Sequence, residues 1–361
     1  MFWKVAISNR APDLLELCRA LSDFFEYAAG QQGQALDEEL FQRSRPEIAD
    51  WLLQEFRGRQ KNKQGLQRAV AELFRLPAAR RRAVADAVAH DMEFWQAGDG
   101  AGFHLQTAAL PEGERALLHD FFLYFNDVVL ARKRGPRLNG RDCPATRAEL
   151  SLDYYQINPV LNQICPVCLS QRRNAVRENE LDHYFPKSVY PVLAVHPWNL
   201  MYICKECNQT YKKDRDCLSD GSRALESVYR PYRDTVREHA ALEFHWKPGE
   251  EHEWVRLRPA VGRGGEVEKI SNFDALFQLE ERWSIDAERL YEELRLCYAG
   301  QGRVEGEDDP RRKEELRGRL ADRARELKRL ADPGFPEKFL ESEYMAWLCG
   351  EQLDAFFAAL D

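Results

Sequence analysis

Two Cys-x-x-Cys pairs constrain this chain more than any other feature of its sequence. Cys165 and Cys168 form the first pair, and Cys204 and Cys207 form the second. A turn of this spacing presents two thiolates to one metal ion, and two such turns complete a tetrahedral four-sulfur site. A closed site leaves no coordination position for a substrate, so its metal is structural. The sequence therefore predicts a zinc ion that staples a small module together.

The remaining cysteines bear on disulfides and on the cellular compartment. The chain has nine cysteines, and an odd number without a signal segment argues against a disulfide framework. Cys217 lies close enough to the second pair to be an alternative ligand, but we expect it to be a buried apolar residue. No apolar run approaches the roughly 20 residues that span a bilayer. We therefore expect a cytoplasmic protein that does not contact the membrane.

Helical periodicity dominates both ends of the chain. A length of 361 residues suits more than one compact core. In residues 1–150, apolar side chains recur at steps of three and four, which predicts amphipathic helices. We expect these helices over residues 12–27 and near 37–57, 66–76, 78–97 and 112–131.

Residues 151–230 lose this periodicity and become rich in Cys, Pro, Asn and aromatic residues. Residues 231–361 begin with an expected β-hairpin over 242–259, with Pro248-Gly249 near its turn. Helices are expected again near 271–297, 310–331 and 336–360. The predicted fold is therefore α+β and mostly helical, with a central metal-stapled module flanked by helical N- and C-terminal regions.

Three clusters of basic residues lie in the first helical region, within 57–63, 80–82 and 132–137. Each could mark a helix end, where cations interact favourably with the helix dipole. Each could instead contact phosphate. The sequence leaves both interpretations open. The third cluster runs into RKRGPRLNGRDCP, which we expect to be a loop.

The segment between the two cysteine pairs carries residues suited to hydrolytic chemistry. Residues 176–183 alternate and are predicted to form a strand that ends in Asp182-His183. Adjacent strand residues point to opposite faces, so both can serve one site only at a bend or a strand end. Asn199 comes next, and Asn208 directly follows the second cysteine pair. Taken singly, Asp182-His183 could be a surface dipeptide, Asn199 a turn residue and Asn208 a helix N-cap.

Taken in order, DHYFPKSVYP and NLMYICKECNQTYKK resemble the HNH family of ββα-metal endonucleases. That family has an Asp-His pair on its first strand and an Asn-Leu before its second strand. Its helix begins with a CxxC motif followed by His or Asn. The resemblance covers residues 165–213, and Asn208 is the Asn variant of the last position. Within the family, the segment looks most like nucleases of bacterial anti-phage systems, such as Septu-type and retron-associated ones.

The resemblance implies a role for each of these residues. His183 would be the general base, and Asp182 and Asn208 would bind a catalytic Mg²⁺ or Mn²⁺. Asn199 would tie the loop to the strands and keep the base in place. We expect three lysines to contact backbone phosphates, namely Lys187, Lys212 and Lys213.

These expectations describe a metal-dependent endonuclease that acts on DNA. The formal net charge of −8 is unusual for a protein that coats nucleic acid, so we expect local patches or a partner to direct binding. The chain has no P-loop, so a partner such as an ATPase or sensor of a defence operon would supply regulation. The alternative is a catalytically inactive, zinc-stapled adaptor that binds nucleic acid or protein.

Overall fold

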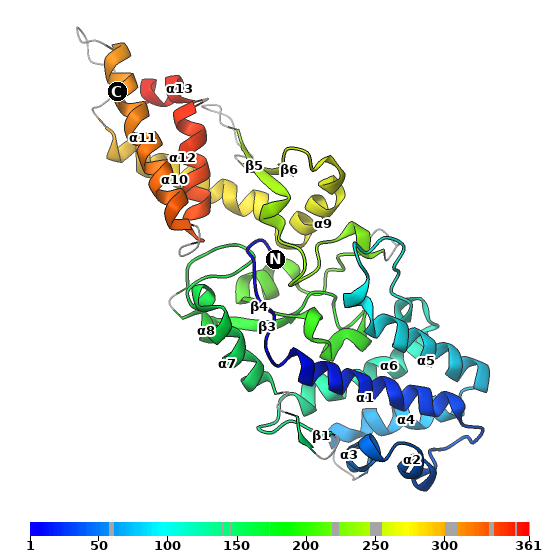
Figure 1. The fold of residues 1–361 in the computed structure, drawn as a ribbon. Helices are drawn as coiled ribbons and strands as arrows, with labels where there is room; N and C mark the ends of the chain where they lie inside the picture. The colour runs from blue at the N-terminus through cyan, green and yellow to red at the C-terminus, as the bar shows by residue number, and fades with distance from the viewer. Residues whose placement is uncertain are drawn as a thin grey trace. The chain divides into compact units, whose positions relative to one another are not determined.

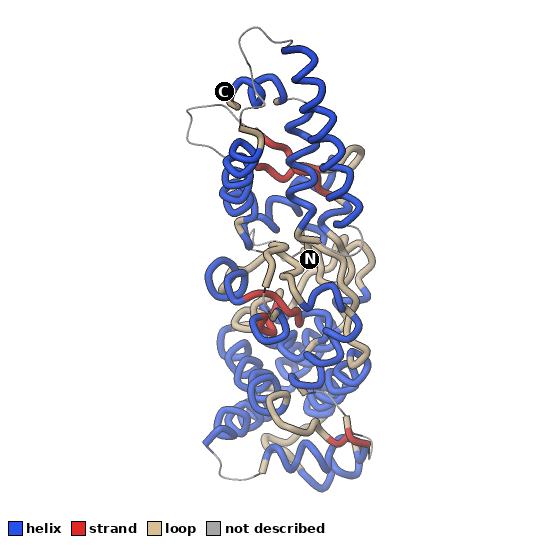
Figure 2. The backbone as a smooth tube through the Cα atoms, turned by 90° about the vertical axis from the view of Figure 1, so that its left-hand side faces the viewer, coloured by secondary structure: helices blue, strands red, loops and turns tan. Residues whose placement is uncertain are grey.

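The computed structural model describes residues 1–361 except 58–60, 139–140, 144–145, 173, 219–223, 246–254, 300–308, 332–335, 351 and 361. The chain divides into two compact units. The first contains Met1, Trp3–Pro159 and Val176–Asp234, and the second contains Phe2, Val160–Ala175 and Thr235–Asp361. Helices predominate in both, and the described strands form three separate two-stranded sheets (Figure 2). The prediction of a mostly helical α+β protein is confirmed at this level.

The first unit begins with helices packed around a phenylalanine-rich core. The Phe24 and Phe121 rings stack, with centroids 5.5 Å apart, and both side chains are fully buried. Helix α1 packs against α5, and α4 packs against α6 (Figure 1). The helices are α1 (Ala11–Gly30), α2 (Glu38–Ser44), α3 (Pro46–Phe56), α4 (Gln64–Arg75), α5 (Ala78–Met92) and α6 (Glu112–Tyr124).

Two of the predicted helices differ from the observed ones. The helix expected over 37–57 is split at Arg45, because the proline at 46 disfavours helical backbone at the preceding residue. The helix expected over 112–131 ends as α6 at Tyr124 and continues as a π-helical turn, η4 (Phe125–Val129). Turns of this kind occur often at functional sites.

A further helix, α7 (Arg147–Ile157), was not predicted. Its first turn is closed by the Thr146 hydroxyl, which accepts a hydrogen bond from the Glu149 amide (3.2 Å) and donates one to the Glu149 carboxylate (2.9 Å). This Thr-x-x-Glu pattern is a capping box and was readable in the sequence. Before it, the expected loop contains a short strand pair, β1 (Arg137–Leu138) and β2 (Arg141–Asp142).

The segment that carries the candidate catalytic residues consists of two strands followed by a helix. Strand β3 (Asn179–His183) pairs antiparallel with β4 (Leu200–Cys204), and η8 (Glu206–Lys212) follows. The strand expected over 176–183 is therefore too long, because Ala175–Glu178 form the short helix α8. Asn179 already pairs with Cys204, the last residue of β4. Residues 176–178 consequently have no facing backbone on β4.

The core of the helices extends into the loop that connects β3 to β4. Val192, Val195 and Leu200 belong to the same buried cluster as the α1 and α6 phenylalanines. The loop residues lie in η6 (Pro191–Val195), which packs against α5 and α6. The N-terminal helices thus support the segment around β3 and β4. The domain boundaries expected at residues 150 and 230 stay a prediction.

The second unit contains the predicted pair of strands and a set of helices. Strand β5 (Ala240–Phe244) pairs antiparallel with β6 (Val255–Pro259), which confirms the expected pairing, while Pro248-Gly249 lies outside the described residues. The helix expected over 271–297 is interrupted at Gln278, whose φ is +50°. Helix α11 packs along α12 (Figure 1). The helices are α9 (Val267–Phe277), α10 (Leu279–Cys297), α11 (Asp309–Ala331), α12 (Lys338–Gly350) and α13 (Leu353–Ala358).

Several residues of the basic clusters form internal contacts. Arg132 donates to both oxygens of Glu55, at 2.6 and 2.8 Å, and the Lys63 ammonium lies 3.7 Å from the same carboxylate. Arg81 is buried and donates to the backbone carbonyls of Gln31 and Gly33. For these residues the structure favours a stabilising role over phosphate contact. None of the described helices is both long and apolar enough to cross a lipid bilayer.

Candidate metal centre and catalytic residues

The four cysteines of the two pairs form one buried cluster. The sulfur atoms of Cys165, Cys168, Cys204 and Cys207 all lie within 4.8 Å of one another. In a tetrahedral site with Zn–S bonds of about 2.3 Å, neighbouring sulfurs are about 3.8 Å apart. The separations and the soft donor atoms suit a closed four-thiolate site. The cluster can therefore bind a structural metal ion such as zinc.

Each pair sits on a turn that brings its two sulfurs together. In the first, the Leu169 amide donates to the Cys165 carbonyl at 2.9 Å, and Leu169 adopts a φ of +59°. A bulky residue rarely has a positive φ, so this backbone conformation is strained and persists only where the surrounding structure imposes it. In the second, the Cys207 amide donates to the Cys204 sulfur at 3.4 Å. Amide donation of this kind stabilises a thiolate.

His183 lies at the end of β3 with its ring almost entirely buried. Its Nε2 lies 2.9 Å from the Ala194 carbonyl and 3.2 Å from Oδ1 of Asn126. Both partners are acceptors, so Nε2 carries the proton and Nδ1 keeps the lone pair. Burial, followed by the positive charge of Lys187, lowers the pKa of His183 to about 3. The imidazole is therefore neutral at pH 7, with the lone pair on Nδ1.

Asp182 faces the opposite way, toward η8. The ammonium of Lys212 lies 3.1 Å from Oδ2 of Asp182, and the Lys212 side chain is 1% exposed. Burial raises the pKa of Asp182, while the charge and hydrogen bond of Lys212 oppose the rise. Strand alternation explains why Asp182 and His183 contact different neighbours. The chain bends directly after His183, at Tyr184 and Phe185.

Asn208 is held by a carboxylate that the sequence analysis did not single out. Its Nδ2 donates to Oε2 of Glu180 at 2.8 Å, and Gln209 donates to the same carboxylate. Glu180 and Asp182 alternate with their neighbours on β3, so both face η8. Among the described residues, the four cysteines are the one group of at least three His, Cys, Asp or Glu side chains close enough to share an ion. A second metal centre at Asp182 and Asn208 therefore stays a prediction.

Asn199 is fully buried and bridges the two ends of the loop before β4. Its Oδ1 accepts from the Phe185 amide at 2.7 Å. Its Nδ2 donates to the carbonyls of Phe185 (3.1 Å) and Leu193 (3.0 Å). The Leu193 carbonyl belongs to the same turn as the Ala194 carbonyl that binds His183. The side chain of Asn199 thereby fixes the segment that orients the His183 ring.

The three candidate phosphate-binding lysines have different surroundings. Lys212 is buried against Asp182, whereas Lys213 is exposed. Lys187 is partly exposed, and its ammonium lies 2.9 Å from Oδ1 of Asp127. Arg147 binds the same oxygen at 3.2 Å. Sequence patterns could not indicate Asp127 or Arg147, because η4 and α7 meet the loop after β3 only through the fold.

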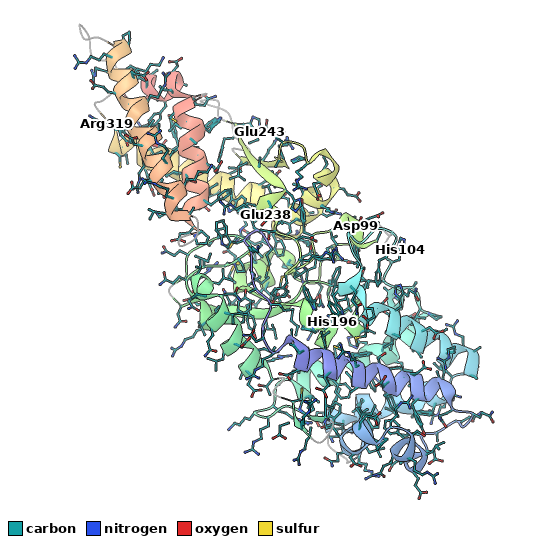
Figure 3. All side chains as sticks on the ribbon, viewed as in Figure 1. Asp99, His104, His196, Glu238, Glu243 and Arg319 are labelled. Carbon is teal, nitrogen blue, oxygen red and sulfur yellow. The ribbon has the colours of Figure 1, made fainter. Side chains whose placement is uncertain are left out.

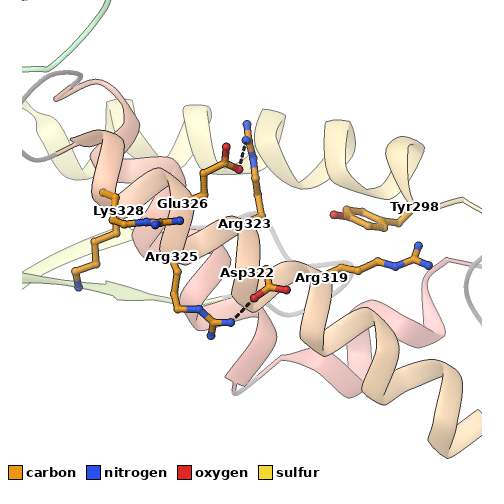
Figure 4. Close-up of a pocket in the computed structure, with 8 residues that line it drawn as sticks. Tyr298, Arg319, Asp322, Arg323, Arg325, Glu326 and Lys328 are labelled. Carbon is orange, nitrogen blue, oxygen red and sulfur yellow. Dashed lines mark hydrogen bonds and ion pairs between the residues drawn. The ribbon is translucent and has the colours of Figure 1, made fainter.

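Two other features involve different residues. His196 (Figure 3) is fully buried, and its ring packs edge-on against Phe94, which indicates a structural role. A groove of about 1280 Å³ runs beside α11 (Figure 4). Its charges are largely paired: Arg323 binds Glu326, and Arg325 binds Asp322. Neither feature adds a catalytic group.

Comparison with protein-family models, with curated proteins and with solved structures finds no match to this chain. The functional interpretation therefore depends on the residues themselves. The four-cysteine cluster indicates a structural metal. The surroundings of His183, Asp182, Asn199 and Asn208 are the basis for proposing a reaction.

Proposed function

We propose that this protein is a metal-dependent HNH-type endonuclease that hydrolyses phosphodiester bonds in DNA. One observation carries the proposal: Asp182-His183 ends the first of two antiparallel strands, and the second strand ends at Cys204 and leads into the π-helical segment η8, which contains Cys207 and Asn208. The order of the elements and the position of each residue agree with the sequence resemblance. The buried four-cysteine cluster supports zinc as the ion that holds this segment.

His183 supplies the proton acceptor for this chemistry. Its neutral imidazole, with the proton on Nε2, leaves Nδ1 to take a proton from the attacking water. The water oxygen then bonds to phosphorus as the bond from phosphorus to the 3′-oxygen breaks, and the leaving 3′-oxygen takes a proton from solvent water. Asn199 acts as a positioning residue, since it fixes the turn whose Ala194 carbonyl holds Nε2.

Asp182 and Asn208 would hold the catalytic Mg²⁺ or Mn²⁺. Oδ2 of Asp182 is buried and lies 3.1 Å from the Lys212 ammonium, and a carboxylate oxygen is a hard donor of the kind that these ions prefer. A bound divalent ion stabilises negative charge on the phosphate and on the leaving oxygen. The Lys212 ammonium neutralises Asp182 in the absence of such an ion.

Cleavage of plasmid DNA by the purified protein, with Mg²⁺ or Mn²⁺, tests the proposal. His183→Gln is the informative variant, because its amide can still donate to Ala194 but cannot act as a base. We expect loss of about 10²- to 10⁴-fold in rate. His119→Ala, at a partly exposed residue of α6, is the control and should keep wild-type activity.

The biological role proposed from the resemblance is a bacterial anti-phage effector directed by a partner such as an ATPase or sensor. The net charge of −8 supports weak intrinsic DNA affinity and hence recruitment by another protein. Size-exclusion chromatography after co-expression with the products of neighbouring genes tests this role. If wild type and His183→Gln are equally inert on DNA and RNA, alone and with such partners, the zinc-stapled adaptor is the better interpretation.

A further inference from the structure

A carboxylate on the π-helical turn η4 lies between two cations close to His183. Oδ1 of Asp127 accepts three hydrogen bonds, from Lys187 (2.9 Å), Arg147 (3.2 Å) and Asn126 (2.7 Å). The cations come from the loop after β3 and from the first turn of α7. Segments far apart in the sequence thus converge on one anionic oxygen.

The two cations have more donors than Asp127 uses. The Arg147 guanidinium donates from Nη2 to Asp127 and to the Asn126 carbonyl, while its buried Nε has no hydrogen-bond partner among the residues that the structure describes. A guanidinium is a planar fork that matches the oxygens of a phosphate. The Lys187 ammonium has three donor hydrogens. A tetrahedral anion with several oxygens would satisfy this pair better than one carboxylate oxygen does.

The site adjoins the candidate base through a single side chain. Nδ2 of Asn126 donates to Asp127, and its Oδ1 lies 3.2 Å from Nε2 of His183. The positive charges of Lys187 and Arg147 both contribute to lowering the pKa of His183, so both are within electrostatic reach of the ring. An anion bound here would lie beside the imidazole.

We propose that Arg147 and Lys187 bind a backbone phosphate of DNA beside His183, and that the Asp127 carboxylate occupies this site until the phosphate displaces it. The inference rests on the proposed function and adds both a phosphate-binding residue, Arg147, and an internal competitor, Asp127. The exposure of the side chains permits displacement: Arg147 is 40%, Lys187 35% and Asp127 47% exposed. Ion pairs this exposed to water are weak.

Binding measurements in an inactive background test the site without relying on cleavage. The probe is a short fluorescent DNA duplex with Mg²⁺, titrated with His183→Gln protein by anisotropy. Adding Asp127→Asn removes the competing charge and should lower Kd by about twofold to fivefold. Adding Arg147→Gln or Lys187→Gln should raise Kd and reduce the slope of log Kd against log salt by about one each.

Matched controls separate the site from general electrostatics. Asp120→Asn removes another ion-paired aspartate, on the neighbouring helix α6, and Arg68→Gln removes the arginine paired with it. Both should leave Kd near the parent value. Circular dichroism melting of each variant identifies any that fail to fold, and for these Asp127→Ser or Arg147→Met replaces the first choice.

The outcomes distinguish the two proposals. If wild type cleaves DNA but Asp127→Asn and Asp120→Asn have the same Kd, the phosphate site is overturned and the nuclease stands. If wild type does not cleave, but Asp127→Asn tightens and Arg147→Gln weakens binding as described, the phosphate site stands and the nuclease fails. Absence of DNA binding in every variant overturns the site.

Discussion

Lys212 and Asp182 form an ion pair with 3.1 Å between Nζ and Oδ2, and the two side chains are 1% and 9% exposed. The pair joins the last residue of η8 to the end of β3, beside the candidate base. Removing one partner of such a pair leaves a buried charge without compensation. The pair therefore fixes the strand–helix geometry on which the proposed chemistry depends.

Lys212→Met should destabilise the protein by about 3–5 kcal/mol, because the Asp182 carboxylate loses its cation. Urea unfolding measures the change. Adding Asp182→Asn should restore part of the lost stability, since the uncompensated charge is then removed. Lys213→Met, at the exposed neighbour, should change stability by less than about 0.5 kcal/mol. A wild-type urea midpoint for Lys212→Met would contradict the buried pair.

Cys204→Ala should abolish stoichiometric zinc binding and unfold the segment around β3 and β4. A structural zinc contributes on the order of 10 kcal/mol to folding, and three thiolates cannot close the site. Elemental analysis gives the zinc content, and limited proteolysis reports the unfolding. Cys217→Ala is the matched control, because Cys217 is buried but is not part of the cluster. Loss of zinc in Cys217→Ala would make that residue a ligand.

Asn199→Ala should cost about 2 kcal/mol or more, because the Phe185 amide and the Leu193 carbonyl lose their partner inside the protein. The DNA cleavage rate should fall further than stability alone explains, since the turn that holds His183 is released. Stability is measured by urea unfolding, and the rate at a temperature where the variant is fully folded. Asn9→Ala, at an exposed residue, supplies the comparison. Equal activity in the two variants would remove Asn199 from the site.

Glu55 should contribute to the stability of the helical region in a pH-dependent way. Burial alone would raise the pKa of this carboxyl, but hydrogen bonds from Arg132 and Tyr124 outweigh burial and lower the pKa below its ordinary value of 4.5. A depressed folded-state pKa stabilises the protein above 4.5, and this stability is lost as pH falls through the folded value. Thermal melting between pH 7 and pH 3 should therefore show a steep acid decline in wild type. A decline of equal steepness in Glu55→Gln would assign the acid sensitivity to other groups.

Most helices and strands could be predicted from the sequence. Where a predicted helix boundary was wrong, the cause lies in neighbouring residues. The periodicity of residues 12–27 and 78–97 indicated helices that the structure contains as α1 and α5, although α5 already ends at Met92. The break at Arg45 follows from Pro46, and the start of α7 follows from the Thr146 capping box. These signals were present in the sequence. The start of β3 at Asn179, three residues later than predicted, is different, because it depends on where β4 stops.

The candidate site was predictable only where its residues lie in one segment. The cysteine cluster followed from spacing, since a CxxC turn fixes the distance between its sulfurs. Asp127, Arg147 and Glu180 could not be assigned in the same way. Their contacts with Lys187 and Asn208 arise when η4, α7 and η8 pack around β3. No spacing of residues in the sequence predicts such long-range contacts.

We expect the cysteine cluster to make the maturation of this protein depend on its metal supply. Cys168 and Cys204 delimit the 35 residues from 169 to 203, which include Asp182, His183 and Asn199. Closing a loop of that length carries a length-dependent entropic cost of about 3 kcal/mol. Helices α1 to α6 supply none of the four cysteines, although α5 and α6 pack against η6 within this loop. The supply of metal would then limit how quickly newly made chains fold around the ion, independently of the rate at which the protein is synthesised.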